Sequence, residues 1–196
     1  MKKSILILTS IFIFCNTYSQ VTKYNWLLGG DGAFSYTNNN SNINASFKTT
    51  NFYLAPNIGY FIWDKVCGGL KFSINTFKIK YPPNQSNGFV SYSTLTQFYG
   101  IGPFARYYFL DNGKVANIFL ETSYQYNLRK DVLPNSTTHQ PANIFAFNAG
   151  PVIYLNSSVG IELTIGYSSL KYDNATGRNN SILANIGLQF YLEKNE

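Results

Sequence analysis

The residues of this chain that could do covalent chemistry are few, and His139 is the only histidine. It lies close to Ser136, Thr137 and Thr138. Hydrolysis by such a group needs a nucleophile beside the histidine and an acid that orients it. Because no nucleophile or acid stands at a recognisable spacing, we expect His139 to be an exposed loop residue and the protein not to be an enzyme. A hydrolase or acyltransferase centred on His139 is kept as an alternative.

A second set of chemically capable residues is charged. It comprises Asp31, Lys71, Arg106, Glu121 and Glu162. Each stands in a different segment in which apolar residues alternate with polar or small ones, and successive side chains of a strand point to opposite faces. All five therefore fall on the face opposite the apolar one. Three acids and two bases nearly neutralise one another, so we expect a structural network; a gate or proton path through Arg106 and Glu121 is the alternative.

The stretch 97–126 reads as two strands joined by the tight turn 111–114, Asp-Asn-Gly-Lys. Asn-Gly is a strong hairpin signal because both central residues of a type I′ turn need a positive φ. If a two-residue turn sets the register, Arg106 lies opposite Phe119, and Arg106 and Glu121 are diagonal neighbours within reach of each other.

Similar alternating runs fill the rest of the chain. Together with the two strands of the hairpin, they make eight runs. The other six are residues 24–36, 47–60, 66–75, 143–155, 159–168 and 182–192. Long polar loops are expected at 37–46, 79–93, 129–141 and 171–180, with short turns between the other runs. Pro56, Pro103 and Pro151 fall inside runs, which argues against central strands unless each occupies a bulge. Eight strands with alternating short turns and long loops predict an all-β, eight-stranded antiparallel up-and-down transmembrane β-barrel.

The first residues have the pattern of an export signal. Lys2 and Lys3 precede an apolar run, 4–15, that is too short for a spanning helix, and small residues follow at 17 and 19, the −3 and −1 positions of a cleavage site. We expect a signal peptide at 1–19 and one barrel domain at 20–196; a lipoprotein anchored through Cys15 is the alternative. The mature chain then has one cysteine, Cys67, so it forms no internal disulfide, and we expect no metal and no cofactor. Loss of the two lysines lowers the net charge from +6 to +4, too little to indicate nucleic acid.

Composition indicates which face of the barrel meets which environment. Aromatic residues make up 17% of the chain and charged residues only 12%, against about a quarter charged in soluble domains. We therefore assign the uncharged faces to lipid and the charged set to the interior. Eight strands enclose only enough room for side chains, which predicts a filled lumen. The reverse assignment describes a soluble lipocalin-like carrier.

Several runs resemble the outer membrane protein β-barrel domain family, the small eight-stranded barrels of the OmpA and OmpX type. They are FYLAPNIGYFI, VCGGLKF, FYGIGPFARYYF and ILANIGLQFYL, and the resemblance covers residues 20 to about 192. It implies export to the outer membrane of a Gram-negative envelope and insertion by the barrel assembly machinery. We expect a monomer.

The remaining expectations concern partners. Lys48, Lys78, Arg129, Lys130 and Lys171 stand where strands meet the predicted loops, and Lys48, Lys78 and Lys171 share the lipid-facing alternation. They are candidates to pair with lipopolysaccharide phosphates, as cations do with anionic head groups; lysines that merely extend to water are the alternative. The four loops are candidates for an extracellular ligand. A narrow channel for water or small solutes is the alternative function.

Overall fold

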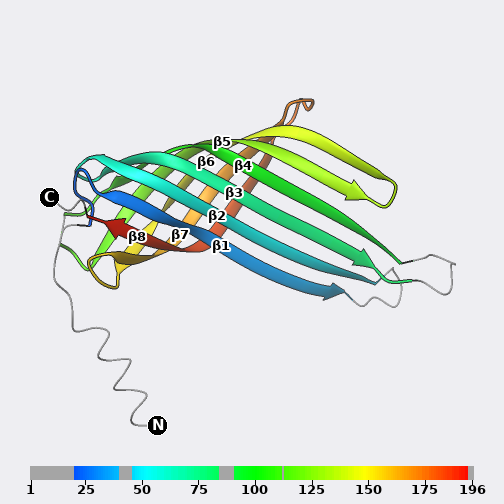
Figure 1. Ribbon diagram of the computed structural model, residues 1–196, viewed down its shortest axis with the longest axis horizontal. Coiled ribbons are helices and arrows are strands. Elements are labelled where there is room, and N and C mark those ends of the chain that lie inside the picture. The colour runs from blue at the N-terminus through cyan, green and yellow to red at the C-terminus, as the bar shows by residue number, and fades with distance from the viewer. Residues whose placement is uncertain (1–19, 40–45, 84–90, 112, 194–196) are drawn as a thin grey trace, which may run out of the picture.

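The computed structural model describes residues 20–39, 46–83, 91–111 and 113–193. The predicted signal peptide, 1–19, lies outside the described residues. The described chain forms eight strands: β1 Trp26–Asn39, β2 Phe47–Trp63, β3 Val66–Tyr81, β4 Tyr92–Tyr108, β5 Ala116–Leu133, β6 Ser136–Tyr154, β7 Val159–Tyr172 and β8 Asn179–Leu192. Each strand pairs antiparallel with its neighbour in sequence, and β8 pairs with β1, which closes the barrel (Figure 1). The predicted fold class is confirmed.

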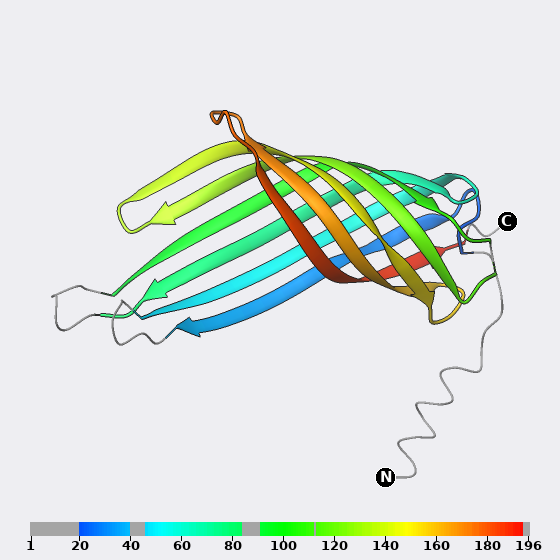
Figure 2. The ribbon, with the colours of Figure 1, turned by 180° about the vertical axis from the view of Figure 1, so that it is seen from behind.

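The two ends of the barrel differ. The start of β1, the end of β8 and the short turns gather at one end, here called the turn end (Figure 1). At the other end, the loop end, the strands of the β1–β2, β3–β4 and β5–β6 hairpins run on well past the closed part of the wall, as Figure 2 shows from behind. Within the described ranges, no helix is long and apolar enough to cross a membrane.

One predicted loop is wrong. Residues 129–141 are almost entirely strand, because β5 continues to Leu133 and β6 begins at Ser136. The two strands stay paired from Leu128 opposite Pro141 to Leu133 opposite Ser136. Polar composition here indicates exposure to water, and backbone pairing does not need an apolar face to continue. The other three predicted loops also lose residues to strands at their ends, and 40–45 and 84–90 lie outside the described residues.

The register of the β4–β5 hairpin also differs from the prediction. Arg106 lies directly opposite Glu121, not opposite Phe119. The connection between the strands is longer than a two-residue turn, and the amide side chain of Asn117 bonds across it. Leu110 N–H donates to Asn117 Oδ1 (2.8 Å), and Asn117 Nδ2 donates to Leu110 O (3.1 Å). Gly113 adopts φ +83°, a conformation in keeping with the turn signal at this point.

The prolines are tolerated without bulges. Pro56, Pro103 and Pro151 lie inside β2, β4 and β6, and the register is the same on either side of each. The one register shift in the described ladders falls between Phe61 and Trp63. The strands therefore accept these prolines without a bulge; a proline lacks an N–H donor, but the bonds on either side keep the strands aligned.

The outer surface of the barrel is apolar. Large hydrophobic side chains are exposed on every strand, among them Trp26, Phe52, Leu70, Ile101, Ile118, Phe147, Ile165 and Ile186. The alternate positions point inward and carry most of the buried polar residues. A soluble barrel has the opposite arrangement, with its apolar face inside.

Buried apolar side chains pack together at the turn end of the interior. The buried cluster comprises Val21, Leu27, Phe61, Cys67, Phe104, Tyr108, Phe119, Val152, Tyr154 and Tyr191. Val21 belongs to the segment before β1 and is 1% exposed; its carbonyl accepts a hydrogen bond from Lys65 N–H (2.8 Å). The chain before β1 thus lies across the turn end and helps to close it. We call this cluster the aromatic floor.

Candidate functional site: the charged lumen

Arg106 is the centre of the interior charge network. From β4 it reaches across the lumen to β5 and β7: Nε and Nη2 donate to Glu121 Oε2 (3.0 and 2.6 Å), and Nη1 donates to Glu162 Oε1 (2.5 Å). Nη1 also donates to the Tyr108 hydroxyl (3.1 Å). The guanidinium carbon lies 4.4 Å from the centre of the Phe119 ring, a cation–π distance.

Glu121 joins the two bases of the network. Its Oε2 accepts from Arg106, and its Oε1 accepts from the Lys71 ammonium and from Asn148 Nδ2 (3.1 Å). The Glu121 side chain is 1% exposed and that of Lys71 8%. Charges taken out of water are tolerated when they are paired and hydrogen-bonded, as these are.

Glu162 completes the set on the β7 side. Its side chain is fully buried, and its second oxygen, Oε2, accepts from Gln189 Nε2 on β8 (3.1 Å). Arg106, Glu121, Glu162 and Lys71 therefore form one connected cluster that links β3, β4, β5 and β7 across the lumen.

Asp31, the fifth predicted member, stands apart. It is buried, at 8% exposure, and lies opposite Ala55 of β2 and Gly187 of β8. Among the described residues, no hydrogen bond or ion pair reaches its carboxylate. The structure thus places all five residues inside the barrel and joins four of them.

The aromatic floor seals the lumen between the cluster and the turn end. The Tyr108 and Tyr191 hydroxyls share a hydrogen bond (3.1 Å), and Phe61 and Tyr154 pack against Tyr191 with ring centres 6.4 and 5.3 Å away. Tyr108, Tyr191 and Phe61 are fully buried. The buried side chains of the cluster and of the floor thus occupy this part of the lumen.

Above the cluster the lumen is hollow. A cavity of about 210 Å³ lies between the charges and the loop end. Its polar lining includes Asp31, Tyr53, Lys71, Ser73, Asn75, Gln125, Asn127, Asn148 and Asn185, and its apolar lining includes Phe98, Ile144, Leu170 and Leu183. The lumen is thus filled with side chains toward the turn end, as predicted, but toward the loop end it has room for a small group.

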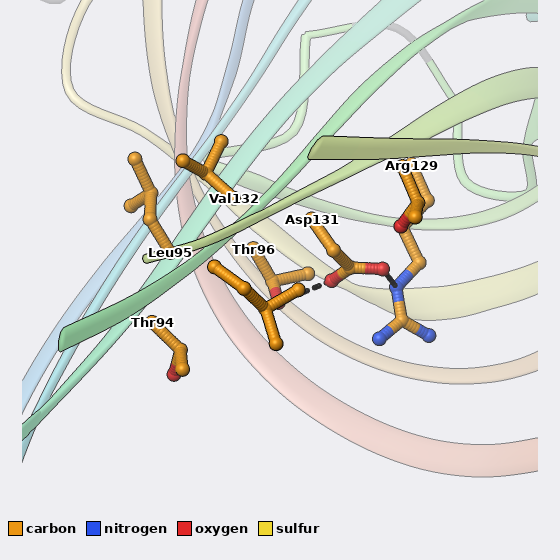
Figure 3. A pocket seen from close by; sticks show the side chains of 8 residues that line it. Thr94, Leu95, Thr96, Arg129, Asp131 and Val132 are labelled. Atoms are coloured by element: carbon orange, nitrogen blue, oxygen red, sulfur yellow. Dashed lines mark hydrogen bonds and ion pairs between the residues drawn. The ribbon is translucent and has the colours of Figure 1, made fainter. Parts of the chain in front are cut away.

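A second pocket, of about 290 Å³, lies on the extensions of β4, β5 and β6 (Figure 3). Asp131 accepts a hydrogen bond from the Thr96 hydroxyl (2.6 Å) and pairs with Arg129 Nε (2.8 Å). Arg129 Nη1 donates to the Tyr172 hydroxyl (3.0 Å), which ties β5 to β7. The ion pair and the two hydrogen bonds link β4, β5 and β7, and we interpret the pocket as part of the structural support of the projecting strands.

The lysines predicted to meet lipopolysaccharide fall in two places. Lys48 of β2 lies opposite Lys80 of β3, with Lys78 two residues away from Lys80 on the same face. Lys171 lies on β7, opposite Asn143. None of the ion pairs among the described residues involves any of the four. Lys80 was not among the predicted contacts, although its spacing of two residues from Lys78 places both lysines on the same face of the strand.

The other candidates stand alone. His139 is exposed on β6, opposite Lys130 of β5, and among the described residues its side chain makes no hydrogen bond or ion pair. Cys67 is buried in the aromatic floor as a free thiol. No group of three or more His, Cys, Asp or Glu side chains within the described ranges could hold a metal ion.

Sequence reasoning missed the neutral members of the site. Tyr108, Asn148 and Gln189 each bond to a charged member of the cluster. All three share the inward alternation, which was a usable signal, but nothing in the sequence says which inward residues meet across the lumen.

Several solved structures are similar in fold to this chain, and two of them are described here. Neisserial surface protein A (NspA) is 17% identical, with a TM-score of 0.51; the match covers 85% of this chain and 96% of that one. The N-terminal β-barrel domain of OprF from Pseudomonas aeruginosa is 16% identical, with a TM-score of 0.50, over 87% of this chain and 98% of that domain. No family model and no curated protein matches. At this identity the likeness shows the fold alone, and the chain has the fold of a small, closed, eight-stranded outer-membrane-type β-barrel, as its resemblance to that family predicted.

Proposed function

We propose that this protein is a non-enzymatic integral outer-membrane β-barrel with a closed lumen, whose loop end serves surface interaction or envelope integrity. The observation that carries the proposal is the inverted distribution of side chains: apolar residues surround the outside, and a paired charge cluster fills the inside. Contact with lipid removes the apolar outer surface of the barrel from water. Water-soluble barrels reach the same result by turning their apolar side chains inward. The likeness to NspA and the OprF domain supports the same placement.

Under this proposal the turn end faces the periplasm and the projecting hairpins face outward, since outer-membrane barrels have short periplasmic turns and longer extracellular loops. The chain is exported by its signal peptide, is inserted by the barrel assembly machinery and acts as a monomer. Extracellular partners meet the hairpin tips between β1 and β2, β3 and β4, β5 and β6, and β7 and β8.

Location and fold are tested together. The protein is expressed with its signal segment, membranes are fractionated, and migration in detergent gels is compared with and without boiling. We expect outer-membrane recovery and a heat-modifiable band. Mature protein that stays in the aqueous fraction without detergent would support the soluble carrier instead.

The closed lumen is tested by planar-bilayer conductance. We expect the wild-type protein to give no reproducible openings, because the cluster and the aromatic floor block the path. A triple variant, Tyr108→Ala, Tyr191→Ala and Arg106→Ala, removes the two central rings of the floor and the centre of the cluster. It serves as the positive control, with openings expected. Reproducible wild-type openings would favour the narrow-channel alternative.

An enzymatic role has little support in the site. A His139→Ala variant is expected to leave envelope lipids unchanged, because the histidine stands exposed on the outer face of a projecting hairpin and makes no hydrogen bond or ion pair with any described residue. A change in lipid composition in that variant, absent in a Lys130→Ala control, would revive the enzymatic alternative.

We also propose that Lys48, Lys78 and Lys80 bind lipopolysaccharide phosphates. Three like charges on adjacent strands repel one another unless an anion lies among them, and none has an acidic partner in the described ion pairs. Lys171, on β7, lies three strands from β2 and four from β3 around the closed barrel and is a separate, weaker contact.

The lysine proposal is tested by lipopolysaccharide retention during purification. The double reversal Lys48→Glu with Lys80→Glu is expected to lower the retained amount several-fold. Lys171→Glu is expected to lower it less, and Lys114→Glu, in the connection at the turn end, should leave it unchanged. Equal retention by all variants would mean that the lysines only extend to water.

A further inference from the structure

The barrel wall is incomplete between β1 and β8. These strands pair over seven positions, from Trp26 opposite Leu192 to Gly32 opposite Ile186. Beyond that point β1 remains paired with β2 as far as Asn39, and β8 remains paired with β7 as far as Asn179. The halves of β1 and β8 nearer the loop end thus diverge, while each stays paired with its other neighbour, as Figure 2 shows. We call the interval between residues 33–39 and 179–185 the seam.

The seam is open to the side. Along β1, every residue from Gly32 to Asn39 is exposed, and along β8 so is every residue from Asn179 to Ala184. Elsewhere in the closed part of the barrel, exposed and buried residues alternate, because one face looks inward. Leu183 has the inward alternation and lines the cavity, yet it is 49% exposed.

The seam begins at a depth where the outside is lipid. Seven residues span about 20 Å along a strand, or about 15 Å across the membrane at a tilt of about 40°. The apolar band of such barrels is about 25 Å tall, so the opening covers about the outer 10 Å of it. This step rests on the proposed membrane location. Unpaired strand edges are not stable against hydrocarbon, so an open seam at this depth needs an occupant with polar groups of its own.

The cavity inside the seam carries an unbalanced charge. Asp31 of β1 and Leu183 and Asn185 of β8 line the cavity from the two sides of the seam. The five interior charges are three acids and two bases, a formal sum of −1. Asp31 is the member without an ion pair among the described residues, and Lys71, the base that shares its cavity, is already paired with Glu121. It lies so close to Gly187 that a Cβ there would stand 2.5 Å from Asp31 Oδ1. A carboxylate held at 8% exposure is stabilised by a cation brought to it.

We propose that the cavity and the seam form a binding site for a single-chain amphiphile with an ammonium head group. The ammonium pairs with Asp31, and the hydroxyl and amide groups of Tyr53, Asn75 and Asn185 surround the head. The chain leaves sideways through the seam, past Phe34 and Leu183, into the outer leaflet. A cavity of about 210 Å³ holds such a head group but not a whole lipid.

The test uses the full mature protein in a maltoside detergent, with dodecylammonium as the probe and calorimetry as the readout. Dodecanoate reverses the charge of the head, and propylammonium removes the chain. We expect dodecylammonium to bind at least tenfold more tightly than either. Equal binding of dodecanoate would overturn the role of Asp31, and equal binding of propylammonium would overturn the role of the seam.

Variants locate the site. Asp31→Asn keeps the shape of the side chain and is expected to weaken dodecylammonium at least tenfold, whereas Asp173→Asn, at the loop end, should leave it unchanged. Phe34→Cys with Ala184→Cys, in a Cys67→Ser background, places two thiols where β1 and β8 would meet if their register continued. Oxidation should weaken binding at least tenfold and reduction should restore it; binding that survives oxidation overturns the lateral path.

Failure of this inference and failure of the proposed function are separable. Each variant is first checked for heat-modifiable migration and insertion into vesicles. If the wild-type protein does not insert, the membrane proposal fails. If it inserts and does not discriminate among the three probes, only the binding site is rejected.

Discussion

Replacing Arg106 by alanine is the perturbation that tests the interior most directly. The Arg106 side chain is 2% exposed and contacts Glu121 at 2.6 Å and Glu162 at 2.5 Å. Without it, Glu121 keeps Lys71 as a partner, but Glu162 is left fully buried with only the Gln189 amide. Removing one member of a buried ion pair costs about 3–5 kcal/mol, and we expect a loss of that size in the free energy of unfolding.

The assay is urea unfolding of protein folded into lipid vesicles, followed by tryptophan fluorescence and by the heat-modifiable band. Arg106→Lys keeps the charge but not the forked geometry, so it should lie between wild type and Arg106→Ala. Arg106→Met with Glu162→Gln removes the charge pair together and should lose less than Arg106→Ala alone. A loss below about 1 kcal/mol for Arg106→Ala, or a larger loss for the double variant, would refute the reasoning.

Two further predictions concern the wall and the turn end. Gly150→Ala is expected to destabilise the barrel by about 1–3 kcal/mol in the same assay, because the new Cβ would stand 1.8 Å from Leu163 O; Gly177→Ala, where nothing lies within 4 Å, should have no effect, and equal behaviour of the two would contradict this. At the turn end, the Lys65 ammonium donates a hydrogen bond to Asp111 (2.6 Å) and holds the pKa of that carboxyl below its ordinary value of 3.8. The stability contributed by the pair is therefore present above pH 3.8 and is lost as the pH falls through the pKa of Asp111 in the folded protein. Titration of Asp111 by NMR should show the lowered pKa and its return in Lys65→Ala; an unchanged midpoint would mean that the ion pair does not persist in solution.

Local alternation determined the strands and their faces. Phe52, Leu54 and Ile58 alternate with inward residues along β2, and the same rhythm marks the other strands. A period of two is imposed by the backbone of each strand alone, so it can be read before any partner is known. For the same reason, all five charged candidates could be assigned to the interior, and the strand order follows from antiparallel neighbours joined by short connections.

The ends and the register of the strands were decided by tertiary structure. The polar segment 129–141 forms a hairpin because each strand finds a partner beyond the apolar belt, which hydrophobicity does not report. Arg106 faces Glu121 directly because the Asn117 side chain closes the hairpin in a longer connection than the Asn-Gly signal predicts. Both depend on bonds between residues whose pairing is set only in the folded chain.

The sequence by itself determined that this chain builds an eight-stranded barrel with an apolar outside and a charged inside, because those properties follow from side-chain alternation along each strand. Only the tertiary structure decided that Arg106 gathers Glu121 and Glu162, that Asp31 forms no ion pair among the described residues, and that β1 and β8 separate beyond Gly32. These features depend on how far neighbouring strands are staggered as the sheet closes, and that stagger is a property of the whole barrel.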